Sequence, residues 1–209
     1  MKNKPLWLNI GSGVHLLKNF VNVDPFMSLA DLKKGIKTKK GWYQNAKIEP
    51  GATFCKASIT ALPQKTGTVD YIESCAMLEH LSLAEVVPAL TEVRRVLKSG
   101  GTAIITTPDF TGGAKSWLEF EAADHLDIDR YVYLSQLTYG NQVGPGEYHR
   151  VPFSPRVLGY MLLTAGWDLD KEVKMTLYPT NSVHPKLKSG RGKGQFFIND
   201  TIVMELTKK

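Results

Sequence analysis

The sequence lacks the features of a secreted, membrane-anchored or zinc-finger protein. Cysteine occurs twice in 209 residues, at Cys55 and Cys75, which excludes a disulfide framework and a cysteine-rich zinc site. The amino-terminal segment has only one short apolar run, at residues 6–10, which favours neither a signal peptide nor a membrane anchor. We therefore expect a cytoplasmic protein with reduced thiols and no membrane partner.

Length and charge set broader limits. With 209 residues, of which 43% are apolar, the chain can bury one sizeable core, so we expect a single domain over residues 1–209. The net charge of +6 permits an anionic partner but does not identify it. The sequence does not indicate an oligomeric state.

Short β-like runs alternate with helical stretches, which predicts an α/β fold with helices on both faces of a sheet. Ser82 and Glu85 have the spacing of a capping box, so a helix should begin there and end at Ser99–Gly101. Another helix is expected over residues 154–165. The expected strands are residues 6–10, 21–24, 52–55, 69–74 and 102–107, with a closing hairpin of 173–178 and 200–207.

Two long segments do not fit this alternation: residues 25–50, rich in lysine, and residues 108–153, rich in aromatic and acidic residues. Both follow expected strands. Ligands of open α/β sheets bind outside the carboxyl ends of the strands, so these segments should form the rim of a binding site. We expect residues 108–153 to be a lid-like insertion.

Residues 8–25, LNIGSGVHLLKNFVNVDP, place two glycines after one strand and an acid at the end of the next. Such a turn brings the backbone close to a ligand and aims the Asp24 carboxylate at ribose hydroxyls. A dinucleotide site would need a third glycine, where Leu16 stands, and about 20 residues before the acid. S-adenosylmethionine has a ribose without a phosphate and tolerates the shorter spacing. In the alternative interpretation, Gly11 and Gly13 only turn the chain.

Residues 59–109 contain, in order, "LP", "VDYIES", "LEHL", "RVLKSGG" and "TTPD". They resemble the middle of class I S-adenosylmethionine-dependent methyltransferases of the type 11 kind. Residues 139–167, which include "EYHR", resemble the late segment of a short branch whose members also carry "LNLGSG" and "VNVD". The resemblance implies a Rossmann-like fold with a seven-stranded mixed sheet, and S-adenosylmethionine as cofactor.

The resemblance also implies roles for residues at the strand ends. The glycine turn would lie against the methionine part of the cofactor, Asp24 on the ribose, and the backbone of Ile59 on the adenine edge. Ser58 stands where the family has an acid that accepts from the adenine amino group, so this contact lacks charge assistance. The cofactor-binding residues implied are Gly11, Ser12, Gly13, Asp24, Ser58, Ile59, Ser74, Cys75 and Met77.

Methyl transfer is an in-line displacement that requires alignment and exclusion of water, and a base helps when the acceptor is a hydroxyl. The candidate catalytic residues are His149, Tyr139 and Asp109. His149 has an alternative role, in which it pins the lid to the domain. We expect His80 to be structural and Glu79 to cap backbone amides. His15, His125 and His184 show no spacing of metal ligands, so no metal site is expected.

Two missing signatures argue against nucleic-acid bases as substrates. Cytosine C5 methyltransferases have proline before the nucleophilic cysteine, where this chain has Ser74, and the Asn/Asp-Pro-Pro-aromatic signature of adenine methyltransferases is missing from ESCAM. The aromatic residues of the insertion are expected to form its own small core instead of stacking on a planar substrate. They are Trp117, Tyr131, Tyr133, Tyr139 and Tyr148.

The sequence thus predicts an S-adenosylmethionine-dependent methyltransferase that acts on O or N of a small anionic acceptor: a sugar nucleotide, a glycan or a carboxylate. The alternative is a protein that binds S-adenosylmethionine without turnover, as a sensor or partner subunit. The lysine-rich residues 33–40 and 185–193 are expected at the mouth of the site, where they attract the anion or are merely solvated.

Overall fold

The computed structural model of the protein describes residues 4–38, 46–125, 127–142, 146–178, 187–188 and 201–209. Seven strands form one sheet in the order β5-β3-β1-β6-β7-β9-β8, and a small sheet pairs β2 with β4. The strands are β1 (Trp7–Ile10), β2 (His15–Leu16), β3 (Val21–Val23), β4 (Lys47–Ile48), β5 (Thr53–Cys55), β6 (Val69–Cys75), β7 (Leu97–Pro108), β8 (Val173–Tyr178) and β9 (Thr201–Thr207).

The large sheet is mixed, as predicted. Strands β5, β3, β1, β6 and β7 are parallel, β9 is antiparallel to β7, and β8 is antiparallel to β9. The carboxyl ends of the parallel strands therefore lie at one edge of the sheet, where the segments singled out in the sequence begin. The expected hairpin is confirmed by the pairing of residues 173–178 with 201–206; residue 200 lies outside the described residues.

Most helices of the described chain are short. They are α1 (Leu29–Thr38), α2 (Leu83–Val96), α3 (Phe110–Glu121), α4 (Ile128–Tyr139) and α5 (Pro155–Thr164), with a 3₁₀ turn η2 (Leu78–His80) after β6. Within the residues described, none of them has the length and apolar character needed to cross a membrane.

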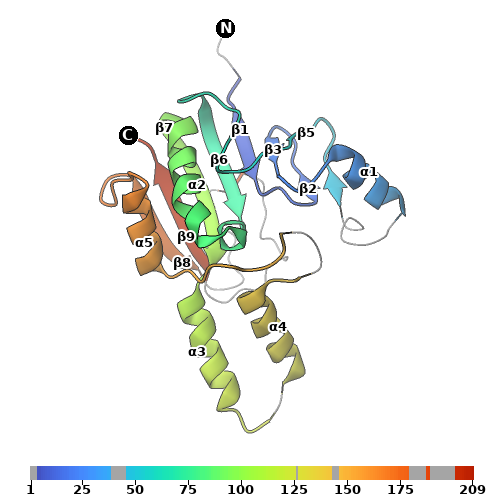
Figure 1. Cartoon of the computed structure of the whole chain (residues 1–209), viewed down its shortest axis with the longest axis vertical. Coiled ribbons are helices and arrows are strands. Elements are labelled where there is room, and N and C mark those ends of the chain that lie inside the picture. Colours follow the sequence, from blue (N-terminus) through green and yellow to red (C-terminus); the bar gives the residue numbers. More distant parts are fainter. Residues whose placement is uncertain (1–3, 39–45, 126, 143–145, 179–186, 189–200) are drawn as a thin grey trace.

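Helices α2 and α5 cover one face of the large sheet (Figure 1). Helix α2 begins at the predicted capping box, in which the Ser82 amide donates to Glu85 Oε2 at 2.8 Å. It buries Val86, Leu90 and Val93 against the sheet. The helix ends at Val96 and the chain enters β7 at once. Lys98–Gly101 form an irregular, bulged stretch of β7, in which Gly100 has a positive φ of 77°, and are not part of the helix end.

On the opposite face, residues 17–20 pack over the middle of the sheet. Leu17 and Phe20 are buried against Tyr71 and Ile104. No helix forms between β1 and β3, where the Asn22 side chain accepts from the Leu17 amide at 2.8 Å and donates to its carbonyl at 3.0 Å. These bonds hold the segment as an extended loop containing β2.

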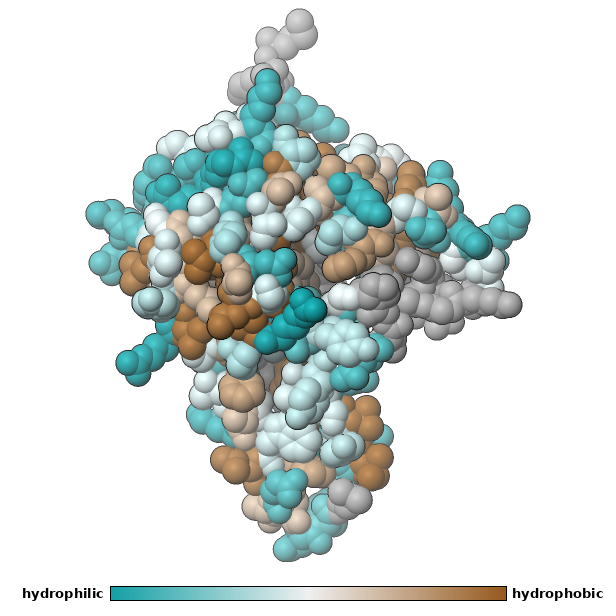
Figure 2. Space-filling model, viewed as in Figure 1, coloured by the Kyte–Doolittle hydropathy of each residue, from teal (hydrophilic) through white to brown (hydrophobic). Residues whose placement is uncertain are grey.

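Helices α3 and α4 form a hairpin that projects from the rest of the molecule (Figure 1). Trp117 packs edge-on against Phe120 and Tyr131, and its Nε1 donates to Thr138 Oγ1 at 2.9 Å. This cluster gives the insertion part of the core that was expected, but Tyr131 is exposed at its edge, and Tyr139 and Tyr148 lie outside it and are exposed as well. Figure 2 shows hydrophobic residues on the hairpin surface, among which Leu118, Ile128 and Val132 are exposed.

Candidate functional site

The turn after β1 is tied to the end of β3. The amides of Gly11 and Ser12 both donate to the Val23 carbonyl, at 2.9 and 3.1 Å. Gly11 and Gly13 have positive φ angles of 66° and 52°, a backbone conformation that residues other than glycine rarely adopt. The Gly13 amide donates to Asp24 Oδ2 at 3.0 Å. The predicted glycine turn and the predicted acid are thus in direct contact.

Asp24 is 7% exposed and also accepts from the Phe26 amide, at Oδ1, at 2.9 Å. Burial raises the pKa of this carboxyl above its ordinary value, although the hydrogen bonds from the Phe26 and Gly13 amides lower it. A carboxylate has about four lone-pair positions, so the bonds from these two amides and from the nearby Met27 amide still leave a position for a hydroxyl. Asp24 is therefore fixed in place and retains the capacity to accept from a ribose.

Residues 74–77, at the carboxyl end of β6, lie beside the glycine turn. A Cβ atom placed on Gly11 would overlap Met77 Cγ and Cβ, so the Met77 side chain packs directly on the Gly11 backbone. Ala76 has a positive φ of 48°, a strained conformation of the kind that accumulates at functional sites. Ser74 is fully buried and Cys75 is half-buried.

Ser58 and Ile59 follow β5, whose last residue, Cys55, accepts from the Asp24 amide at 3.3 Å. Ser58 Oγ accepts from the Thr60 amide at 3.2 Å and pairs with Thr60 Oγ1 at 2.9 Å, while Ile59 is buried. Ser58 thus orders its own turn. Ser58 and Ile59, which were predicted to contact the adenine, therefore follow a strand that ends at the same edge of the sheet as the strand before Asp24.

A cavity of about 200 Å³ lies at the carboxyl end of β7, between the base of the α3–α4 hairpin and residues 149–153. Of the predicted catalytic residues, His149 and Tyr139 line it. Asp109 is instead the N-cap of α3, where its two oxygens accept from the Thr111 and Gly112 amides at 3.0 and 3.2 Å. The lining includes Glu79, Phe110, Leu137, Tyr139, His149 and Arg150.

The segment after the hairpin, residues 146–150, connects this cavity with the site formed by Asp24 and the glycine turn. A Cβ atom on Gly146 would meet the Phe26 ring at 2.8 Å, two residues from Asp24. Farther along the same segment, the His149 amide donates to the Tyr139 carbonyl at 3.2 Å and the Arg150 amide donates to the Glu79 carbonyl at 2.7 Å. One continuous segment therefore borders both sites.

Glu79, His80 and His149 come together beside the cavity, a grouping that the sequence analysis missed. Their potential ligand atoms lie within 4.8 Å of one another. Burial raises the pKa of Glu79 to about 7 and lowers the pKa of His80 to about 4, and burial also lowers the pKa of His149. The available signal was the pair of motifs "LEHL" and "EYHR", which were interpreted separately.

The structure describes only some of the basic residues that were expected at the mouth of the site. Lys33, Lys34 and Lys37 are on α1, while Lys39, Lys40, Lys186, Arg191 and Lys193 lie outside the described residues, as does His184. Lys188 Nζ lies 4.0 Å from the centre of the Trp7 ring and 4.5 Å from that of Tyr71. Since Trp7 is the first residue of β1, Lys188 lies away from the carboxyl-end mouth where it was expected.

Residues 9–105 match the sequence model of a family described as a methyltransferase domain. This range contains the glycine turn, Asp24, the Ser58 turn and the end of β6. A comparison with curated protein sequences gave no significant match.

Solved structures with the same fold include several methyltransferases. The chain aligns over its full length with 84% of an S-adenosylmethionine-dependent methyltransferase from Thermotoga maritima, a possible histamine N-methyltransferase (17% identity, TM-score 0.55). It aligns likewise with 94% of one from Methanosarcina mazei (14%, 0.57). It also aligns with 49% of a Haemonchus contortus phosphoethanolamine N-methyltransferase in complex with phosphomonomethylethanolamine and S-adenosylhomocysteine (13%, 0.54). The predicted Rossmann-like methyltransferase fold is confirmed.

Proposed function

We propose that this chain, a methyltransferase that uses S-adenosylmethionine, transfers the methyl group to O or N of a small anionic acceptor bound in the cavity lined by Tyr139, His149 and Arg150. The cofactor would lie across the carboxyl ends of β1, β3, β5 and β6. Its ribose would bind Asp24, its methionine part would lie on the glycine turn, and its adenine would lie near Ser58 and Ile59.

The observation that carries this proposal is the contact between the Gly13 amide and Asp24 Oδ2 at 3.0 Å. It places a carboxylate directly beside a turn whose backbone a ligand can approach closely. A ligand with vicinal hydroxyls and no phosphate on the turn fits this geometry, because no helix begins after the turn to receive a pyrophosphate.

The position and charge of the cavity support the assignment of the acceptor. It adjoins η2, which directly follows the Ser74–Met77 segment, so an acceptor there would lie next to the methyl donor. Arg150 offers an exposed guanidinium at its wall, a group that binds carboxylates and phosphates. His149 and Tyr139 would contact the acceptor, while Asp109 is committed to capping α3.

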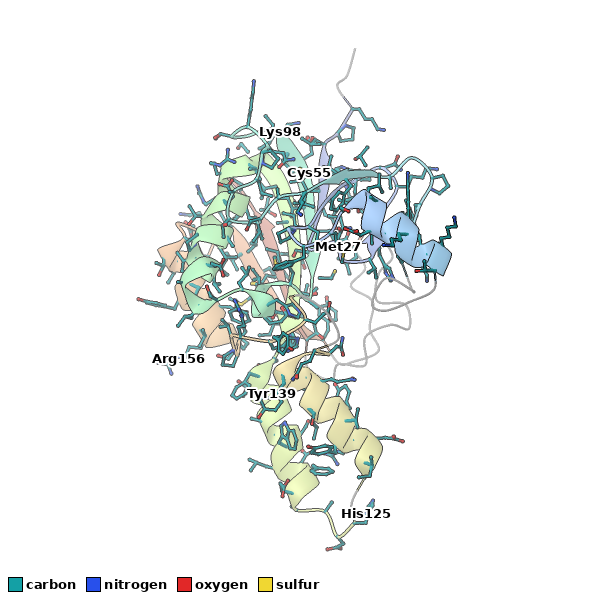
Figure 3. All side chains as sticks on the ribbon, turned by 45° about the vertical axis from the view of Figure 1, so that its right-hand side comes forward. Met27, Cys55, Lys98, His125, Tyr139 and Arg156 are labelled. Carbon is teal, nitrogen blue, oxygen red and sulfur yellow. The ribbon has the colours of Figure 1, made fainter. Side chains whose placement is uncertain are left out.

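The test is transfer of a labelled methyl group by the full chain to sugar nucleotides, glycans and small carboxylates, each assayed alone. We expect S-adenosylhomocysteine to form with an anionic acceptor. Arg150→Ala should raise KM for that acceptor about tenfold or more, which is about 1.4 kcal/mol, without changing cofactor affinity. Arg156→Ala, a substitution on the surface of α5 (Figure 3), is the matched control and should change neither.

Turnover with neutral acceptors alone would refute the anionic assignment. Cofactor binding without turnover on any acceptor class would favour a sensor or partner subunit.

A further inference from the structure

We propose that Glu79, His80 and His149 form a binding site for a divalent transition-metal ion at the inner wall of the acceptor cavity. The three side chains offer one carboxylate oxygen and two imidazole nitrogens, and these atoms lie within 4.8 Å of one another. The residues come from η2 and from the segment after α4, which are far apart in sequence. Two of them, Glu79 and His149, line the cavity.

Glu79 provides the first independent observation. It is 2% exposed, and its Oε2 accepts from Thr107 Oγ1 at 3.0 Å. Its Oε1 is buried and has no hydrogen-bond partner in the part of the chain that the structure describes. No ion pair to Glu79 occurs among the described residues either. A buried carboxylate oxygen without a partner is costly, and a bound cation would remove that cost.

The two histidines are oriented as metal ligands usually are. Nδ1 of His80 lies 3.1 Å from the Tyr148 carbonyl, and Nδ1 of His149 lies 2.9 Å from the Leu137 carbonyl. A neutral imidazole that donates Nδ1–H to such a carbonyl keeps Nε2 as the atom that can bind a metal, as at His149. The His80 ring also contacts the Ala76 carbonyl, a contact that the ion would have to displace. The rings meet edge to face with their centres 4.8 Å apart. A single ion can therefore be reached by both rings.

The backbone holds the two segments together. The amides of Arg150 and Val151 both donate to the Glu79 carbonyl, at 2.7 and 3.3 Å.

Bonds to zinc from nitrogen and oxygen ligands are about 2.0–2.2 Å long, shorter than the present separations of the three side chains allow. The side chains would therefore have to close slightly around the ion, while the backbone that carries them is already joined.

The ligand set indicates the class of metal. Two imidazoles and one carboxylate suit zinc or iron(II) better than magnesium or calcium, which prefer oxygen ligands. Three protein ligands leave a coordination position open, as catalytic sites do. Because Glu79 and His149 line the cavity, that position is available to the anionic group of an acceptor, a role that rests on the proposed function. His149 would then be a metal ligand and not a general base.

The test is titration of the full chain with Zn²⁺ by calorimetry, and with Co²⁺ by its visible absorption, in the absence of S-adenosylmethionine. We expect one ion per chain. The visible absorption of bound Co²⁺ should be that of an ion with a low coordination number. Glu79→Gln and His149→Ala should each weaken Zn²⁺ binding by about 100-fold or more. His125→Ala is the matched control, because His125 is exposed at the tip of the hairpin, far from Tyr139 (Figure 3), and it should bind as the unaltered protein does.

Circular dichroism should show that each variant is folded. His80→Gln is the substitution to use if Glu79→Gln does not fold, and it should also lose the ion. The proposal is overturned if the unaltered chain binds no Zn²⁺, if the folded variants bind it equally well, or if Cys75→Ser alone removes binding. The same samples are titrated with S-adenosylmethionine, so failure of the metal site is distinguished from failure of the methyltransferase assignment.

Discussion

The Asp24 carboxylate and the Gly13 amide are joined by a hydrogen bond of 3.0 Å, which links the end of β3 to the turn after β1. The bond orders the turn, and in the proposed site the remaining lone pairs of Asp24 would accept from the ligand. Substitutions at Asp24 should therefore affect both the shape of the turn and the contact with the ribose.

Asp24→Ala should weaken S-adenosylmethionine binding by about 1.5–3 kcal/mol, because it removes charge-assisted hydrogen bonds. Asp24→Asn keeps one acceptor for the Gly13 amide, so it should lose less. Calorimetry with S-adenosylhomocysteine measures both variants. Unchanged affinity in Asp24→Ala would refute the role of Asp24.

The two glycines of the turn form a matched pair. Both have positive φ, so alanine is strained at either position by about 1–2 kcal/mol. Only at Gly11 would the new Cβ also collide with Met77, whereas the space beside Gly13 is open. Gly11→Ala should therefore lose more cofactor affinity and more unfolding free energy than Gly13→Ala, and Met77→Ala should partly restore it. Equal losses at both glycines would show that the Gly11–Met77 contact is unimportant.

Ser58→Asp tests the adenine contact. The aspartate can keep the hydrogen bond from the Thr60 amide and offers the adenine amino group a stronger acceptor. We expect affinity for S-adenosylmethionine to be unchanged or improved in calorimetry. A loss of more than about tenfold, or roughly 1.4 kcal/mol, would indicate a different adenine position.

Cofactor affinity should depend on pH through Asp24. In the proposed site the ionised carboxylate would accept from the ribose, and burial raises its pKa above the ordinary value of 3.8. Binding is therefore full above the raised pKa and weakens as the pH falls through it, starting at a higher pH than for an exposed aspartate. Kd measured across acidic pH should show this decline in the unaltered chain and not in Asp24→Asn. A decline that persists in Asp24→Asn would assign it to another group.

Local patterns in the sequence predicted most of the sheet. Strands β1, β3, β5 and β6 are short apolar runs that end in turn signals, and the capping box at Ser82 fixed the start of α2. The extended segment after Gly13 was not predictable in this way. It depends on Asn22, a residue on another strand, whose side chain satisfies the Leu17 backbone.

The site was predictable where it lies on strand ends and not where distant segments meet. Gly13 and Asp24 flank neighbouring strands, so their contact follows from the topology. His80 and His149 are brought together by the fold of the α3–α4 insertion, which leaves no signal in local periodicity. The capping role of Asp109 could have been predicted, because aspartate is a favourable residue at the N-cap, directly before a helix such as the one that begins with "FTGG".

Calorimetric titration of the purified chain with S-adenosylmethionine, S-adenosylhomocysteine and NAD tests the central claim most directly. We predict that both sulfur-containing ligands bind at one site per chain, and that NAD binds far more weakly because no helix begins at the turn to receive its pyrophosphate. Preferential binding of NAD, or no binding of S-adenosylmethionine by the folded chain, would contradict the account.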